Sequence, residues 1–166
     1  MGKTFHNSRF VGYDLSEEGI AAARQEAQKL GLSNVSFEVQ DAATLEAPGQ
    51  YDMITAFDTI HDLAQPAKVL KNIAGALRPG GTFFMGEFAA SSHLQENLDH
   101  PLGSMLYAFS VLYCMTTSLA NGGEGVGTMW GEQTARRYLQ EAGFTDVEIK
   151  QIEGDSLHSY FIASKQ

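Results

Sequence analysis

Five side chains that could bind a ligand or move a proton follow apolar runs in the first part of the chain. They are Asp14, Asp41, Phe57, Asp58 and His61. In an open parallel sheet, ligands bind at the carboxyl ends of the strands, where such residues meet. A carboxylate only accepts hydrogen bonds and can take two donors, whereas a histidine titrates near neutral pH. The pattern therefore predicts carboxylates that hold hydroxyl or amino groups and a histidine able to act as a general base.

Plainer roles are open for three of these residues. Asp14 could cap a helix or lie in a loop, and Asp41 could be the N-cap of a short helix. His61 could pack in the interior and hydrogen-bond the backbone instead of taking a proton. Because the remaining histidines show no metal-ligand spacing, we predict no metal site. These dispersed histidines are His6, His93, His100 and His158.

Strands and helices are expected to alternate along the chain. Composition and periodicity predict strands at residues 9–14, Val35–Val39, Tyr51–Phe57, 82–88, Asp146–Ile152 and 159–164. Helices are predicted after Ser16, after Pro66 and over residues 132–142. Such alternation favours an α/β fold with a mostly parallel sheet that helices cover on both faces. The last two strands, joined by a turn at Glu153-Gly154-Asp155, are expected to form an antiparallel hairpin.

The composition is that of one soluble domain. The chain has 166 residues, of which 43% are hydrophobic, and a formal net charge of −9. This length is sufficient for a real core. The acidic charge argues against direct nucleic-acid binding, which requires a basic face. Cys114 is the only cysteine, so no internal disulfide is predicted, and the polar first ten residues show no signal peptide. Both features favour a cytoplasmic protein.

Residues 101–120 carry no charged side chain over twenty positions, a length that could span a bilayer. The segment also contains serines, threonines and tyrosines, and its strongly apolar residues recur at steps of three and four. This spacing predicts an amphipathic helix that is buried or lies in an interface, and no membrane span. The apolar positions are Leu102, Met105, Leu106, Phe109, Leu112, Met115 and Leu119.

Residues 89–131 are predicted to form a helical insertion that acts as a lid. Its segment Gly122-Gly123-Glu124-Gly125-Val126-Gly127 has the glycine spacing of a nucleotide loop, but it follows a predicted helix. A nucleotide loop must lead from a strand into a helix, so we interpret these glycines as a hinge beside a substrate pocket. Nearby side chains either line that pocket or pack in the core. They are Tyr107, Tyr113, Met129 and Trp130.

Several segments, in their order and spacing, resemble the class I S-adenosylmethionine-dependent methyltransferases. They are FVGYDLS at 10–16, QDA at 40–42, YDMITAFD at 51–58 and LRPGG at 77–81. Longer stretches, such as SRFVGYDLSEEGIAAAR and MTTSLANGGEGVGTMWGEQ, look most like bacterial methyltransferases with an N-terminal winged-helix domain. The resemblance implies a Rossmann-like sheet, S-adenosylmethionine as cofactor and a small-molecule acceptor that is methylated at oxygen.

The same resemblance implies roles for individual residues at the cofactor. Asp14 matches the acid that accepts hydrogen bonds from both ribose hydroxyls, and Asp41 matches the residue that meets the adenine amino group. Ala42 would offer its backbone N–H to the adenine ring. The remaining residues assigned to cofactor binding are Tyr13 and Leu15, which would flank the adenosine, and Phe57 and Asp58.

The segment Thr59-Ile60-His61-Asp62 looks like the His-Asp pair of plant-type small-molecule O-methyltransferases. In those enzymes the histidine is the general base. The resemblance therefore makes His61 the expected catalytic residue, in a reaction that removes a proton from the attacking oxygen.

The family's first strand and its glycine-rich loop have no counterpart before Phe10. The resemblance places that strand between residues 9–14 and Tyr51–Phe57. Without it, two strand edges would lack a partner, so we expect a homodimer or complementation by a separate N-terminal half. Two other functions stay open: a non-catalytic assembly or regulatory domain derived from a methyltransferase, and a NAD-dependent oxidoreductase, which also needs the acid at Asp14.

Overall fold

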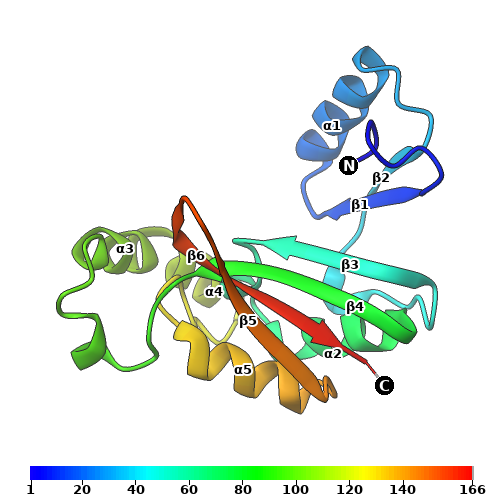
Figure 1. The fold of residues 1–166 in the computed structure, drawn as a ribbon. Helices are drawn as coiled ribbons and strands as arrows, with labels where there is room; N and C mark the ends of the chain where they lie inside the picture. The colour runs from blue at the N-terminus through cyan, green and yellow to red at the C-terminus, as the bar shows by residue number, and fades with distance from the viewer. Residues whose placement is uncertain (166) are drawn as a thin grey trace. The chain divides into compact units, whose positions relative to one another are not determined.

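The computed structural model describes residues 1–165 and divides into two compact units, Met1–Leu45 and the part of the chain from Glu46 onward. Each unit has its own sheet (Figure 1). The six strands thus form two sheets, and the prediction of one mostly parallel sheet is wrong in this respect. Among the described residues, β1 (Phe10–Asp14) pairs only with β2 (Val35–Val39), and β3 (Tyr51–Phe57) pairs only with β4 (Leu77–Phe88). No described strand therefore joins the two sheets.

The first unit is one strand–helix–strand crossover. Strand β1 pairs in parallel with β2 (Val35–Val39), with Phe10 opposite Val35 and Asp14 opposite Val39. Helix α1 (Glu17–Lys29) joins them and buries Ile20 and Ala27. A short 3₁₀ helix, η1 (Ala42–Thr44), follows β2. The predicted parallel pair and its helix are therefore confirmed for this part of the chain.

The start of α1 follows directly from its sequence. The Ser16 hydroxyl accepts a hydrogen bond from the Gly19 N–H at 3.0 Å, so Ser16 is the N-cap. Glu17 and Glu18 lie in the first turn, where the helix dipole favours negative charge. The helix ends before Gly31, whose φ of 66° is in the left-handed region that glycine adopts without strain.

The second unit contains a four-stranded sheet in the order β3-β4-β6-β5. Strand β4 (Leu77–Phe88) is parallel to β3, whereas β6 (Asp155–Ser164) is antiparallel to both β4 and β5 (Asp146–Ile152). The C-terminal antiparallel hairpin is confirmed, with Ile152 opposite Asp155 and Gly154 at a φ of 89° in the turn between them.

Strand β4 begins five residues earlier than the predicted start at residue 82. Leu77 already pairs with Tyr51, and the register then shifts so that Thr82 pairs with Met53. The extra residues include Gly80, whose φ of 76° lets the chain bulge between the two pairs. The helix before it, α2 (Pro66–Ala76), starts at the predicted proline.

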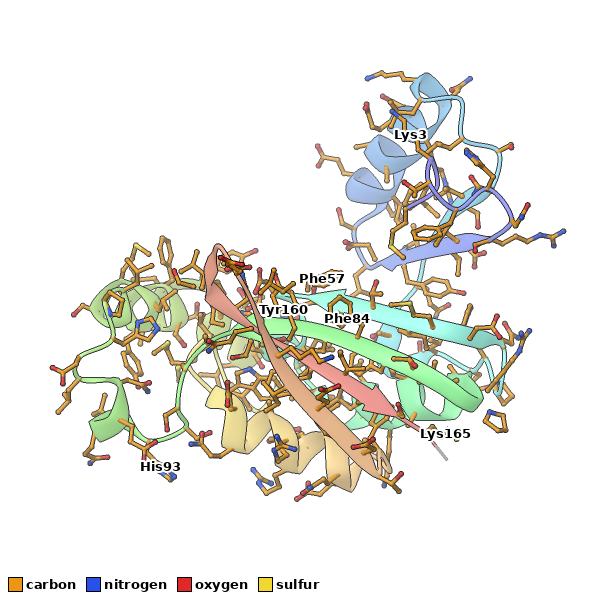
Figure 2. All side chains as sticks on the ribbon, viewed as in Figure 1. Lys3, Phe57, Phe84, His93, Tyr160 and Lys165 are labelled. Atoms are coloured by element: carbon orange, nitrogen blue, oxygen red, sulfur yellow. The ribbon has the colours of Figure 1, made fainter. Side chains whose placement is uncertain are left out.

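Helices α2 and α5 (Gly131–Glu141) lie on one face of the four-stranded sheet (Figure 1). Alternate residues of β4 and β6 point to that face and are buried, as the two-residue period of a strand requires. The opposite face carries Phe57, Phe84 and Tyr160, which Figure 2 labels. The core between the helices and the sheet includes Leu70, Leu77, Phe83, Met85, Leu139, Phe144, Phe161 and Ala163.

Residues 103–120 form a helical segment of three pieces: α3 (Gly103–Phe109), the π-helical turn η4 (Ser110–Cys114) and α4 (Met115–Ala120). Of the two predicted environments, burial within the chain does not hold for most of its large apolar side chains, since Met105, Phe109, Leu112 and Leu119 are exposed, and the interface alternative stays a prediction. The segment instead buries a row of small residues together with one leucine. They are Gly103, Leu106, Ser110, Cys114 and Ser118.

The glycine-rich segment explains why small residues face inward. A Cβ added to Gly127 would lie 2.2 Å from the Ser110 hydroxyl oxygen, and one added to Gly123 would lie 2.5 Å from that of Ser118. Because the backbone of the glycines approaches the helix this closely, a large side chain at Ser110 or Ser118 would collide with it. No helix of residues 1–165 is long and apolar enough to cross a bilayer.

Candidate functional site

Asp14 and Asp41 lie at the same end of the two-stranded parallel sheet. Asp14 closes β1 opposite Val39, and the Gln40 N–H donates to the Asp14 carbonyl oxygen at 2.9 Å. Asp41 follows one residue later. The register of one strand pair therefore brings these two predicted site residues together, as expected from the direction of parallel strands.

Both carboxylates also make the capping contacts that the plainer interpretation predicts. Asp14 Oδ1 accepts a hydrogen bond from the Ser16 N–H at 2.8 Å, and Asp41 Oδ1 accepts one from the Ala43 N–H at 2.8 Å. A carboxylate has about four acceptor positions on its two oxygens. The local bonds orient the side chains and are compatible with further donors from a ligand.

The residues predicted to flank the adenosine differ in exposure. Leu15 is 65% exposed, directly after Asp14, and Tyr13 is half-buried in β1. Ala42 opens η1, the turn that Asp41 caps. The exposed Leu15 side chain can pack against the apolar face of a nucleoside. The carboxylates of Asp14 and Asp41 can accept hydrogen bonds from its hydroxyl and amino groups. The donor and acceptor set of this end of the first unit therefore fits an adenosine.

Phe57 and Asp58 belong to the second unit. Phe57 is 48% exposed and packs edge-on against Phe84, with ring centroids 5.5 Å apart. Asp58 has a φ of 46°, the only positive value among non-glycine residues of the described chain. Its N–H donates to the Gly86 carbonyl oxygen at 3.0 Å, which holds this uncommon backbone in place. Such strained residues cluster at functional sites and ligand clamps.

Asp58 takes part in a charged network with the last strand. Its Oδ2 is 3.2 Å from Nε2 of His158, whose Nδ1 is 2.9 Å from Oδ2 of Asp155. The Tyr160 hydroxyl donates to the same Asp155 oxygen at 2.6 Å. Burial lowers the pKa of His158, but the two aspartates outweigh burial and raise it above its usual value. His158 was not predicted as a site residue.

This network gives a prediction for the pH dependence of stability. The raised pKa of His158 stabilises the fold fully below about pH 6.5, the ordinary histidine value, and the stabilisation is lost as the pH rises through the folded-state pKa. His158→Gln should therefore lose about 0.5 to 1 kcal/mol of unfolding free energy at low pH and much less at high pH. Urea unfolding over a pH series measures this difference. The exposed His93→Gln serves as control, and a loss that grows with pH would contradict the assignment.

His61 belongs to the second unit, where it is buried in the turn that follows β3. It is 2% exposed and belongs to the 3₁₀ turn η2 (Ile60–Asp62). Its Nδ1 is 2.5 Å from Oε2 of Glu87, and its Nε2 is 3.1 Å from Oδ1 of Asp62. Both ring nitrogens therefore face carboxylates.

Glu87 is itself held by three neighbours. It is 1% exposed in β4 and accepts hydrogen bonds from the Ile60 N–H at 3.2 Å and from Trp130 Nε1 at 3.3 Å, besides its contact with His61. A buried carboxylate needs such partners, because water is not available to solvate it. Glu87 was missed from the sequence, where the only signal is one acid inside the apolar run of residues 82–88.

Electrostatic interactions keep a proton on the cluster formed by His61, Asp62 and Glu87. Burial lowers the pKa of His61, but the hydrogen bonds and charges of Asp62 and Glu87 outweigh burial and raise it to about 11. Burial raises the pKa of Glu87 above its usual value, although His61 acts in the opposite sense. Both shifts mean that the His61–Glu87 pair holds a proton at neutral pH. This geometry suits a fixed structural pair better than a free proton acceptor.

The four residues expected near a substrate pocket divide between the core and the surface. Trp130 and Met129 are buried, at 4% and 7% exposure, and Trp130 bonds Glu87. Tyr107 is half-buried and its hydroxyl accepts from the Asn97 amide at 3.0 Å. Tyr113 is exposed. Core packing therefore accounts for the tryptophan and the methionine.

Comparisons with known proteins identify the family of the chain. Residues 2–143 match the family described as "Methyltransferase domain". The ubiquinone biosynthesis O-methyltransferase of Burkholderia pseudomallei is 28% identical over 155 residues, which are 92% of this chain and 62% of that protein. The chain thus spans less than two thirds of the length of this curated relative.

Solved structures share the fold at low identity. PigF, solved with S-adenosylhomocysteine, superposes with a TM-score of 0.75 at 20% identity, over 99% of this chain and 45% of PigF. An S-adenosylmethionine-dependent methyltransferase from Methanosarcina mazei gives a TM-score of 0.66 at 18% identity, over 98% of this chain and 85% of that one. With the family match over residues 2–143, the chain belongs to the class I S-adenosylmethionine-dependent methyltransferase family.

Proposed function

We propose that this chain contributes the adenosine site and most of the catalytic scaffold of an enzyme that methylates a small molecule at oxygen. The observation that carries the proposal is the pair Asp14 and Asp41 at adjacent strand ends, in a chain that matches the family over residues 2–143. The similarity to an O-methyltransferase of ubiquinone biosynthesis favours oxygen as the acceptor atom. The stretches SRFVGYDLSEEGIAAAR and MTTSLANGGEGVGTMWGEQ favour the subgroup of bacterial methyltransferases that carry an N-terminal winged-helix domain.

S-adenosylmethionine, when bound, supplies an electrophilic methyl group on a sulfonium. Transfer of that methyl group to the acceptor oxygen would release the acceptor's proton and leave S-adenosylhomocysteine as the second product. Asp14 would accept the ribose hydroxyls and Asp41 the adenine amino group, which fixes the position of the methyl relative to the acceptor. Alignment of this kind is the main contribution of the protein to a direct displacement.

Two roles compete for His61. As the general base it would take the acceptor's proton, which requires a ring nitrogen that is free of protons and open to the acceptor. As a positioning residue it would hold the turn after β3 against β4. Its 2% exposure, its two carboxylate neighbours and its pKa of about 11 favour the positioning role. In that case His61→Gln lowers thermal stability and leaves the pH profile of kcat unchanged, whereas loss of a base changes the profile.

The exposed apolar face of residues 103–120 is the best support for the expected homodimer. Met105, Phe109, Val111 and Leu112 are all at least 46% exposed, and the segment has no charge that would repel a second copy. Apolar patches of this kind mark interaction sites. We place the dimer interface there, and a monomer in sedimentation at high concentration would contradict it.

Calorimetric titration of the purified chain with S-adenosylhomocysteine tests the proposed cofactor site, with NADH as the control ligand. Binding of S-adenosylhomocysteine at micromolar concentration and none of NADH would support the methyltransferase assignment. Binding of NADH alone would support the oxidoreductase alternative. Binding of neither ligand by the folded chain would leave the non-catalytic assembly or regulatory domain as the function to pursue.

A further inference from the structure

Three potential metal ligands meet in the second unit, although their sequence spacing gives no sign of it. A ring nitrogen of His61, a carboxylate oxygen of Asp62 and Sγ of Cys114 all lie within 4.8 Å of one another. Two of the residues belong to η2, and Cys114 closes the π-helical turn η4. The fold thus brings together an imidazole, a carboxylate and a thiol, the three side-chain types that bind zinc.

Asp62 supplies the first independent sign that a cation belongs here. Its Oδ1 is buried and has no hydrogen-bond partner among the described residues. The atom lies 3.1 Å from Nε2 of His61, an ion pair when the ring is protonated. Burial raises the pKa of Asp62, but contacts with His61 and Cys114 outweigh burial and lower it. A buried carboxylate oxygen without a donor is costly unless a charge compensates it. The protonated His61 ring supplies that charge in the cation-free chain, and a metal cation bound to Oδ1 and Nε2 would take its place.

His61 supplies the second sign, through the partner of its other nitrogen. Metal-binding histidines commonly bond a carboxylate through the ring nitrogen that does not bind the metal, which fixes the ring and its tautomer. Nδ1 of His61 makes this contact with the buried Glu87, and the Ile60 N–H and Trp130 Nε1 hold Glu87 in turn. Nε2 thereby faces Asp62, whose Oδ1 is 3.1 Å away.

Cys114 is held in an equally specific way. It is 7% exposed, and its Sγ is 2.9 Å from the Thr128 hydroxyl oxygen. The π-helical turn that contains it is a rare geometry, found often at functional sites.

We propose that His61 Nε2, Asp62 Oδ1 and Cys114 Sγ bind a divalent cation that prefers thiolate and imidazole, with zinc as the best fit. The donor set excludes magnesium and calcium, which require oxygen ligands. Binding replaces the proton on Nε2 and the thiol proton, and both protons pass to solvent. Nε2 and Oδ1, 3.1 Å apart, already have about the spacing of two tetrahedral zinc ligands, so only Cys114 Sγ needs to move closer, and a fourth position remains for water or another ligand.

Such an ion would tie the turn after β3 to the helical insertion that contains Cys114. It would also make His61 a ligand and not the general base. The proposal does not depend on methyl transfer, because metal binding is measured on the chain without S-adenosylmethionine. It stands against the prediction of no metal, which rests on histidine spacing alone.

Titration of the chelator-treated protein with Co²⁺ tests the site directly. Cys114 is the only cysteine, so a near-ultraviolet thiolate-to-cobalt charge-transfer band can come from no other residue. We expect one equivalent of Co²⁺ to produce the band and Zn²⁺ to abolish it. We also expect Zn²⁺ to slow alkylation of Cys114 in the unmodified chain at least tenfold, a readout that needs no variant.

Variants separate the proposed site from adventitious binding. Asp62→Asn keeps the shape of a side chain that is 29% exposed and should weaken Co²⁺ binding at least tenfold, whereas Cys114→Ser should remove the band. His93→Gln and Asp99→Asn, at exposed positions of the same insertion, should leave both the Co²⁺ affinity and the thiolate band unchanged. A folded protein that takes up Co²⁺ without the thiolate band, or whose Cys114 alkylates equally fast with Zn²⁺, would overturn the proposal.

Discussion

Asp14→Asn is expected to weaken binding of S-adenosylhomocysteine about ten- to hundredfold, because a hydrogen bond to a charged group contributes about 1.5 to 3 kcal/mol. Asparagine keeps an oxygen that can accept from the Ser16 N–H, so the start of α1 should remain intact. What the substitution removes is the negative charge and part of the acceptor capacity needed for two ribose hydroxyls. Calorimetric titration gives the two dissociation constants.

The control for this experiment is Asp146→Asn, an exposed aspartate at the start of β5 in the other unit. It should bind S-adenosylhomocysteine as the unmodified chain does. Circular dichroism of Asp14→Asn shows whether α1 is retained. Equal dissociation constants for Asp14→Asn and the unmodified chain would mean that Asp14 is only a cap, and that the adenosine site must be sought elsewhere.

Glu87→Leu should destabilise the second unit by about 3 to 5 kcal/mol, the usual cost of removing one partner of a buried ion pair. The change leaves His61 Nδ1, the Ile60 N–H and Trp130 Nε1 without their acceptor in a region that excludes water. Denaturant unfolding followed by circular dichroism measures the loss, and the fluorescence of Trp130, the only tryptophan, reports the same unit.

Glu148→Leu is the matched control, since Glu148 is also a strand glutamate but its side chain is 59% exposed. That variant should change the unfolding free energy by no more than about 0.5 kcal/mol. The double variant Glu87→Leu with His61→Leu should regain part of the loss, because it removes the unpaired charge. A loss below about 1 kcal/mol for Glu87→Leu alone would show that the pair contributes little.

Local sequence patterns were sufficient for most of the elements. The β1–α1–β2 unit follows from an apolar run, a Ser16 cap and Gly31 at the helix end, and the C-terminal hairpin follows from two runs around Gly154. Local patterns also predict that Asp14 and Asp41 lie at the same end of the sheet. Each follows a strand directly, and two parallel strands joined by one helix must end on the same side.

The helical segment of residues 103–120 shows where periodicity fails. Its large apolar residues repeat at helical spacing, yet Phe109 and Leu112 are exposed and Ser110 and Ser118 are buried. Hydrophobicity alone would bury the face with the large apolar residues and expose the face with the serines. The outcome depends on the close approach of a second segment, Gly122 to Gly127, whose backbone leaves room only for small side chains.

The sequence by itself therefore determined the elements, the family and the two carboxylates at the ends of β1 and β2. Only the tertiary structure decided the surroundings of His61, since Glu87, Trp130 and Cys114 reach it from β4 and from the insertion. It also decided that Asp58 meets His158, one hundred residues away. Contacts within an element or a single crossover follow from local spacing, whereas contacts between distant segments depend on strand register and backbone approach, which no local pattern encodes.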